Sequence, residues 1–313
     1  MILTIQIASA IEKDSTSIFR KYYFKPHITM ADDDCDACGC SASGGSMGFA
    51  SMLNSNFVGI RYFNQEYRTT DGLYSNSLWY QEKFKTLQIW ARIPVFKKFQ
   101  VSAQIPYHSH DRDTNKGIQT IQGVGDINIM GIYQLLQTHK DSTVFVHTLN
   151  LGVGVKLPTG KYEQSNSGLV NPSFQLGTGS WDYTIMTEYV LKRKRIGLNS
   201  MLNYIFKTEN SNYYRFGNQF NYSSTLFYLF ETDDELAIAP QLGIAGEVYD
   251  SNYQYRELLR FTKGDVFFGK IGFELGKKRF SIGGNTMFPL VQNLASGRVE
   301  AQIRWSFNIN FSL

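Results

Sequence analysis

The three cysteines of the chain carry its most reactive side chains, and they lie close together as Cys35, Cys38 and Cys40. Aspartates surround them in the run DDDCDACGC of residues 32–40. Thiolates at this spacing bind soft or borderline metals such as copper(I) or zinc. Three nearby residues could supply a fourth ligand: His27, Met30 and Met47. In an oxidising compartment the same spacing allows a disulfide from Cys35 to Cys38 or Cys40, with one thiol left over. The sequence leaves a disulfide, a metal site and redox chemistry open.

A second group of metal-ligand side chains is the run HSHD at residues 108–111, in a polar stretch that we expect to form a loop. Two histidines and an aspartate can bind a divalent cation, but a solvated loop is the simpler interpretation.

A hydrolase would need Ser, His and a carboxylate at one point, and no serine motif accompanies His147. No glycine-rich phosphate loop opens a helix. We therefore predict no enzyme.

The elements that must position these groups are visible in the alternation of the sequence. In VEAQIRWSFNINFSL, residues 299–313, every second residue is apolar and the residues between are polar. Because successive side chains of a strand point to opposite faces, this segment has one apolar and one polar face. It also exceeds the usual strand length of about five or six residues. Such a strand is typical of the one that closes a membrane β-barrel.

Eleven further segments alternate in a similar way, so we predict an all-β, antiparallel, up-and-down transmembrane β-barrel of about twelve strands. The predicted strands are 56–68, 77–95, 100–108, 125–137, 144–157, 181–191, 196–207, 213–230, 236–249, 265–275, 280–288 and 299–313. Tight turns such as FKKF, KRKR and GKKR alternate with connections that are mostly longer. This asymmetry is typical of outer-membrane barrels, which have their short turns in the periplasm.

The composition agrees with a barrel and disfavours other classes. Aromatic residues make up 15% of the 313 residues and there are only 7 prolines, which favours strands over disorder. The net charge of +4 comes without a basic block, so we expect no nucleic-acid partner. No apolar run approaches the roughly 18 residues of a transmembrane helix.

Charged residues recur on the polar face of many predicted strands. A packed soluble core would bury them at a large desolvation cost, whereas a membrane barrel turns this face to its lumen. There the charges would tune the preference for ions or solutes. The predicted lumen-lining residues are Arg61, Arg92, Asp126, Lys156, Asp182, Glu188, Arg215, Glu247, Lys270, Glu274, Glu300 and Arg304.

The first 54 residues do not alternate, and we divide them into two parts. Residues 1–10, MILTIQIASA, resemble the end of a signal peptide that lacks its basic start, with an ordinary tail as the alternative. Residues 11–54 form an N-terminal extension with the cysteine cluster, which we expect to plug the lumen or to dock a periplasmic partner. Residues 55–313 form the barrel.

Three glycine-containing motifs follow one another within the predicted barrel: GVGDI at residues 123–127, KLPTG at 156–160 and GTGSWD at 177–182. In this order and spacing they resemble the outer-membrane family named for the meta-pathway of phenol degradation, over the chain from about Arg92 onward. The resemblance implies an outer-membrane barrel for the uptake of small, often hydrophobic compounds, and it assigns no catalytic residues.

Taken by themselves, the motif residues allow two interpretations. The glycines and Pro158 can shape turns and bulges at the rim of the barrel. Alternatively, Asp126, Lys156 and Asp182 form an ion-pair network that narrows the lumen.

We therefore predict a channel or transporter in the outer membrane of a Gram-negative cell, passing a small, hydrophobic or aromatic solute through a charge-lined lumen. Its partners would be membrane lipid, the solute and, through the extension, a periplasmic protein. The alternative is a barrel scaffold whose cluster of Cys35, Cys38 and Cys40 binds copper or zinc, or docks the periplasmic partner.

Overall fold

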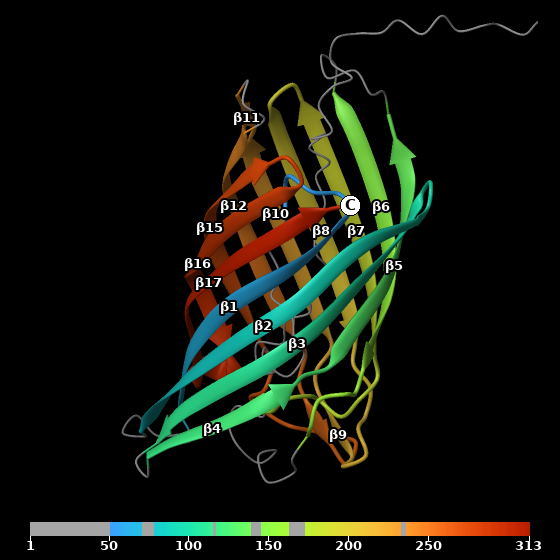
Figure 1. The fold of residues 1–313 in the computed structure, drawn as a ribbon. Coiled ribbons are helices and arrows are strands. Elements are labelled where there is room, and N and C mark those ends of the chain that lie inside the picture. Colours follow the sequence, from blue (N-terminus) through green and yellow to red (C-terminus); the bar gives the residue numbers. More distant parts are fainter. Residues whose placement is uncertain (1–50, 71–77, 115–116, 139–144, 163–172, 233–235) are drawn as a thin grey trace, which may run out of the picture.

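The computed structural model describes residues 51–70, 78–114, 117–138, 145–162, 173–232 and 236–313, and the structural statements below concern these residues. They form a closed antiparallel barrel (Figure 1). The twelve wall strands are β1 (Phe57–Thr70), β2 (Trp79–Phe96), β3 (Phe99–Thr114), β5 (Ile127–Gln137), β6 (Val146–Leu157), β7 (Asp182–Arg193), β8 (Ile196–Phe206), β10 (Gln219–Tyr228), β12 (Leu236–Tyr249), β15 (Gly264–Lys277), β16 (Phe280–Leu294) and β17 (Val299–Ser312).

Shorter elements complete the structure. Strand β4 (Gly117–Val124) pairs with β3, and β11 (Phe230–Glu231) pairs with β12. A small separate sheet contains β9 (Tyr214–Arg215), β13 (Tyr253–Gln254) and β14 (Glu257–Leu258). A short 3-10 turn, Ala295–Gly297, precedes β17.

The barrel closes where β17 pairs with β1, so that Phe57 lies opposite Ser312 and Thr69 opposite Val299. On its other side β1 pairs with β2, and at the far side of the ring β10 pairs with β12. Both the predicted barrel of about twelve strands and the predicted pairing of the last strand with the first are confirmed.

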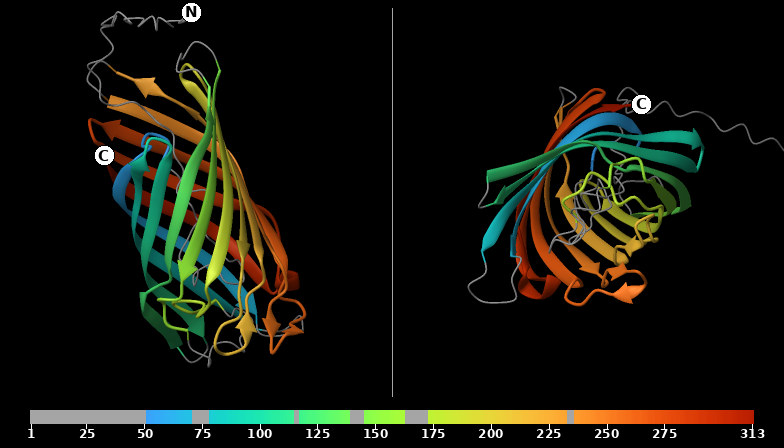
Figure 2. Two further views of the ribbon diagram at one scale, coloured as in Figure 1. Left: turned by 90° about the vertical axis from the view of Figure 1, so that its right-hand side faces the viewer. Right: turned by 90° about the horizontal axis from the view of Figure 1, so that it is seen from below.

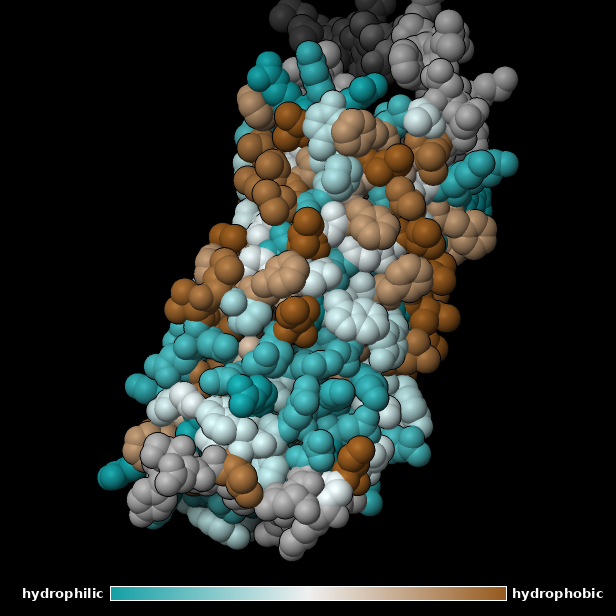
Figure 3. Space-filling view, turned by 90° about the vertical axis from the view of Figure 1, so that its left-hand side faces the viewer, coloured by the Kyte–Doolittle hydropathy of each residue, from teal (hydrophilic) through white to brown (hydrophobic). Residues whose placement is uncertain are grey.

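The wall strands have an apolar outer face and a largely polar inner face. On β17, Trp305 and Ile309 are exposed on the outside, whereas Ser306 and Asn308 are buried on the inside. Figure 3 shows the outward apolar side chains as a broad brown belt, with a hydrophilic zone below it. A closed wall with an apolar belt is a structure that can span a lipid bilayer, because every wall strand is paired on both sides.

No helix among the described residues is both long and apolar enough to cross a membrane.

The two ends of the barrel differ. Two-residue turns link β2 to β3, β7 to β8 and β15 to β16 at one end, which we call the turn end. The C-terminal end of β17 lies there too (Figure 1). The opposite loop end carries β4, the described residues 158–162 and 173–181 between β6 and β7, and the small sheet of β9, β13 and β14 (Figure 2). The predicted asymmetry between turns and loops is therefore present.

The polar stretch after His108 was expected to be a loop, and this prediction is wrong. Strand β3 continues to Thr114 and pairs with β4 along its second half. The outward side chains of this part, such as Asp111 and Asp113, are polar because the hairpin extends beyond the apolar belt. Polar residues on both faces hide the period of two on which the prediction depended.

A second difference lies at the start of β17. Gln65 of β1 is opposite Arg304, but Tyr67 is opposite Ala301, so the register shifts by one residue. Because side chains alternate with a period of two, such a shift exchanges the two faces. Val299 and Ala301 are consequently buried inside the barrel. Glu300 points outward and lies 3.4 Å from Arg68 in an exposed ion pair, so its predicted place in the lumen is wrong.

Candidate functional site in the barrel lumen

Most of the predicted lumen residues point into the barrel and are buried there. These are Arg61, Arg92, Asp126, Lys156, Asp182, Glu188, Glu247, Lys270, Glu274 and Arg304. Besides Glu300, the exception is Arg215, which lies on β9 in the small sheet at the loop end, with its guanidinium 4.2 Å from the ring centre of Tyr253. Its prediction is wrong because the segment 213–230 alternates from its start, although only Gln219–Tyr228 belongs to the wall.

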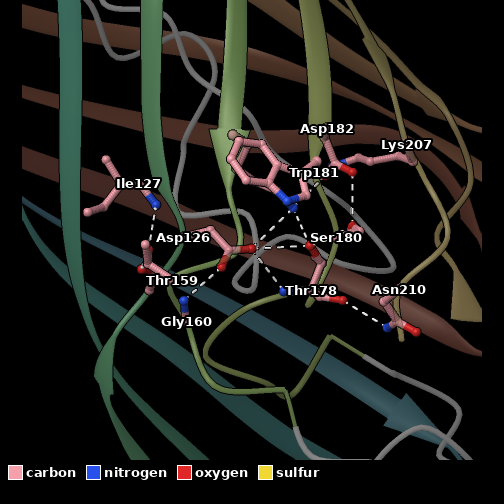
Figure 4. Close-up of polar contacts among 12 residues, drawn as sticks. Asp126, Ile127, Thr159, Gly160, Thr178, Ser180, Trp181, Asp182, Lys207 and Asn210 are labelled. Carbon is pink, nitrogen blue, oxygen red and sulfur yellow. Dashed lines mark hydrogen bonds and ion pairs between the residues drawn. The ribbon is translucent and has the colours of Figure 1, made fainter. Parts of the chain in front are cut away.

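The three glycine motifs meet at the loop end of the lumen around two buried carboxylates (Figure 4). Lys156 lies between them, with its Nζ 3.2 Å from Asp126 Oδ2 and in contact with Asp182 Oδ2. Lys207 follows β8 and places its Nζ 3.3 Å from Asp182 Oδ2. We call these four residues the Asp–Lys cluster. Two cations and two anions offset one another there, which is the condition under which charges are tolerated in a buried site.

The carboxylate of Asp126 also holds together the two described parts of the connection between β6 and β7, residues 158–162 and 173–181. Asp126 accepts hydrogen bonds from the backbone N–H groups of Gly160 and Thr178, each at 2.9 Å. A methyl group on Gly177 would lie 2.4 Å from Asp126 Oδ1 and 2.6 Å from the Gly160 carbonyl oxygen. Glycine is therefore required where these loops cross. The motif residues therefore shape the loops and at the same time form an ion-pair network. Narrowing of the lumen by this network stays a prediction.

Further polar groups complete the Asp–Lys cluster. Ser180 Oγ donates to Asp182 Oδ1 at 3.0 Å, and the Thr208 N–H donates to the same oxygen at 3.2 Å. Asn210 Nδ2 donates to the Thr178 carbonyl at 2.9 Å. Thr178 and Ser180 lie in the GTGSWD motif, and Lys207 is a charged residue at the end of a predicted strand, whereas Thr208 and Asn210 had no signal in the sequence.

Further charge pairs cross the lumen. Arg92 on β2 is 3.2 Å from Glu188 on β7, although three wall strands separate β2 from β7 in the ring. Arg304 on β17 binds Glu247 on β12 through two contacts, of 2.6 and 3.0 Å. Such two-point arginine–carboxylate contacts are strong and geometrically specific. These side chains therefore connect distant parts of the wall through the interior of the barrel.

A further buried charge pair, Arg112 with Glu82, was missed by the sequence analysis. It joins the neighbouring strands β3 and β2, on which the two residues lie directly opposite each other. Arg112 Nη2 lies 2.6 Å from Glu82 Oε1, and both side chains are buried. Arg112 lies in the part of β3 that was expected to be a loop. The alternation around Glu82 predicted a strand, but it did not indicate which side chain would pair with the Glu82 carboxylate.

The inner face at the loop end is also aromatic. Phe63, Tyr67, Phe84, Phe174 and Phe268 are buried in one cluster, which we call the aromatic cluster. The ring centres of Tyr67 and Phe84 are 5.5 Å apart, and those of Phe84 and Phe174 are 6.1 Å apart, both edge-to-face. This site was not predicted, because outward and inward aromatic residues look alike in a sequence this rich in Phe and Tyr.

Two buried arginines stack on the aromatic cluster. The guanidinium carbon of Arg304 is 4.3 Å from the ring centre of Phe268, and that of Arg112 is 4.2 Å from the ring centre of Phe174. Stacking of this kind is attractive and strengthens away from water. These stacks connect the aromatic cluster with the Arg304–Glu247 and Arg112–Glu82 pairs in one continuous inner surface.

The histidines of the HSHD run do not form the metal site considered above. His108 and His110 are buried inside the barrel, with ring centres 4.8 Å apart, and His108 Nδ1 is 2.8 Å from Thr86 Oγ1. Asp111 points outward and accepts a hydrogen bond from Lys85 at 2.7 Å. Across the described ranges, no three His, Cys, Asp or Glu residues are grouped to hold a metal ion.

Other candidate residues have different surroundings. His147 Nδ1 lies 2.6 Å from the hydroxyl of Tyr189. The predicted metal ligands Cys35, Cys38 and Cys40 lie outside the described residues, as do the fourth-ligand candidates His27, Met30 and Met47. Metal binding, a disulfide and redox chemistry at these cysteines therefore stay predictions.

The sequence profile of the family described as "Putative MetA-pathway of phenol degradation" matches residues 90–288. No curated protein matches the chain. Among solved structures, an outer membrane channel from Pseudomonas putida F1 has a TM-score of 0.61 at 13% identity, covering 85% of this chain and 98% of that one. This similarity shows a common fold.

Two other solved structures are less similar. The beta domain of the Bordetella autotransporter BrkA has a TM-score of 0.49 at 8% identity and covers 82% of this chain and 99% of its own. A FadL homologue from Pseudomonas aeruginosa has a TM-score of 0.39 at 9% identity, covering 90% of this chain and 99% of its own.

Proposed function

Since the chain belongs to the MetA-pathway of phenol degradation family, whose profile matches more than half of it, we propose that this outer-membrane barrel is a channel for a small, uncharged, hydrophobic or aromatic solute. The solute would enter at the loop end and pass along the inner surface formed by the aromatic cluster and the charge pairs.

The aromatic cluster is the observation that carries this proposal. Aromatic rings on an inner surface offer stacking and edge-to-face contacts to a planar apolar solute, and small-molecule sites are commonly apolar with a few fixed polar groups. Phe84 is central to the cluster, because its ring contacts those of Tyr67, Phe174 and His110.

The pairing of the lumen charges supports an uncharged solute. Arg92, Arg304 and Arg112 each face a carboxylate at hydrogen-bonding distance. The Asp–Lys cluster likewise combines two positive and two negative side chains. Because charge selectivity in a pore comes from rings or rows of one sign, these paired charges favour neither anions nor cations strongly.

The similar proteins support the same conclusion. The Pseudomonas putida structure is named an outer membrane channel, and the description of the family refers to phenol degradation. The first is consistent with a channel, and the second with an aromatic solute.

Ion current through single barrels in a planar bilayer tests the proposal. We expect benzyl alcohol, used as the probe, to reduce the current at concentrations at which glycerol does not, because only the aromatic probe can occupy the aromatic cluster. Phe84→Ala should weaken this block several-fold. Tyr133→Ala is the matched control, because Tyr133 is an aromatic residue on the outer face and is 47% exposed.

Equal block in the Phe84→Ala, Tyr133→Ala and unaltered proteins would overturn the role of the aromatic cluster. A correctly folded barrel that passes no current, whether unaltered or carrying Glu274→Ala, would overturn the channel function and leave a structural role.

A further inference from the structure

Residues Ser51–Asn54, which come just before β1, lie inside the barrel at its turn end. They belong to no strand, yet their exposed fractions are only 0%, 0%, 2% and 1%. Figure 1 shows this start of the described chain in blue, at the end of the barrel where the C-terminus lies. A connecting segment normally lies on the surface, because its backbone polar groups need partners. The partners of this segment are therefore informative.

A single buried carboxylate, that of Glu274 on β15, holds the segment. Its Oε2 accepts the backbone N–H groups of Met52 at 2.6 Å and Leu53 at 3.1 Å. Its Oε1 accepts the Ser51 hydroxyl at 2.6 Å. Asn54 Nδ2 lies 3.3 Å from the same Oε1 and donates to Ser281 Oγ at 2.6 Å. A carboxylate in a buried site needs donors of this kind, and here the segment supplies most of them.

The apolar side chains of the segment reach across the lumen in two directions. Met52 packs in one cluster with inward residues from β5, β7, β8 and β10: Met130, Ile132, Met186, Met201 and Phe227. Leu53 packs in another cluster with Leu229, Ala237 and Ala239, at β10 and β12. Together with Glu274 on β15, these contacts connect the segment to wall strands on opposite sides of the ring.

We propose that Ser51–Asn54 is a latch that closes the turn end of the lumen, and that the inner surface around Glu274 is its binding site. This inference rests on the proposed channel function. The short turns place this end in the periplasm, so the latch controls passage between the lumen and the periplasm. Opening requires the segment to leave Glu274, and the carboxylate then needs water or another group of donors in its place.

Hydrogen exchange measured by mass spectrometry tests the binding site without any transport. The amides of Met52 and Leu53 should be protected in the unaltered barrel, and Glu274→Ala should speed their exchange at least tenfold. Phe273→Ala is the matched control, because Phe273 is the neighbouring residue on β15 but points outward and is 47% exposed. Met52→Asn provides a second variant that leaves the wall unchanged. Heat-dependent mobility on gels checks that each barrel is folded.

Ion current then tests closure. Glu274→Ala and Met52→Asn should raise the conductance several-fold over the unaltered and Phe273→Ala barrels. Free exchange of both amides in the unaltered protein would overturn the latch. Variants that release the amides but conduct no more than a conducting unaltered barrel would overturn closure and leave the channel function intact. If the variants speed the exchange of the Met52 and Leu53 amides but no barrel, altered or unaltered, conducts ions, the channel function itself is overturned.

Discussion

Lys156 is the residue on which the Asp–Lys cluster depends, because it lies between two buried carboxylates. Lys156→Met keeps most of the side-chain volume but leaves Asp126 and Asp182 with one cation fewer. Breaking a buried ion pair costs about 3–5 kcal/mol, because the remaining charge is left uncompensated. We expect a loss of this order in the free energy of unfolding, measured by urea titration of the barrel in liposomes.

Lys85→Met is the control for this substitution. Lys85 also binds an aspartate, at 2.7 Å, but its side chain is 39% exposed. Exposed ion pairs contribute up to about 1 kcal/mol, so the loss should be small. Equal losses for the two lysines would contradict the description of the Asp–Lys cluster as buried and charge-compensated.

For single residues, the sequence predicted which face of a strand they lie on but not which residues they contact. Alternation was enough to place Arg92, Glu188 and Arg304 on inner faces, because it depends only on neighbours along the chain. It could not pair Arg92 with Glu188, since that contact depends on which strands face each other across the closed ring. The latch was beyond prediction as a structure, because Ser51–Asn54 has no periodicity and its contacts with the lumen are with residues far along the sequence.

At the scale of elements, the wall strands were predictable where lipid lies on one side and the polar lumen on the other. Outside the apolar belt that contrast is missing, so the second half of β3 and strand β4 were taken for a loop. The shift between β1 and β17 was also unpredictable, because a register belongs to a pair of strands and not to either one alone. Its consequence was the wrong face for Glu300.

The outer face of β12 allows a direct test of the membrane belt. Leu242 lies midway along this strand and is 64% exposed. An arginine facing lipid costs about 2–4 kcal/mol at the bilayer midplane and much less near the interfaces. Leu242→Arg should lower the stability of the barrel in liposomes by this amount. Asp113→Arg, which is outward but beyond the belt, should have an effect below about 1 kcal/mol; a cost as large as that of Leu242→Arg would contradict the position of the belt.

For the molecule as a whole, the balance of charges in the lumen should set its ion preference. Glu247→Gln removes one negative charge opposite Arg304, while the amide oxygen can still accept a hydrogen bond from the guanidinium. The lumen then carries an additional uncompensated positive charge. In a potassium chloride gradient we expect the reversal potential to move toward anion preference, recorded in a barrel with the latch released. Arg304→Met should move it the other way. An unchanged reversal potential in both variants would contradict passage of ions along this part of the lumen.

The pairing of β1 with β17 has a consequence for the biogenesis of the protein. Translation completes β17 after all the other wall strands, so until then β1 has only β2 as a neighbour and β16 has only β15. Both carry a row of unpaired backbone groups, and such edges readily pair with other chains. The exported chain must therefore be kept apart from others until its last strand is available. A chain that stops before residue 299 would keep two open edges, so we expect it to be degraded and not to form a smaller barrel.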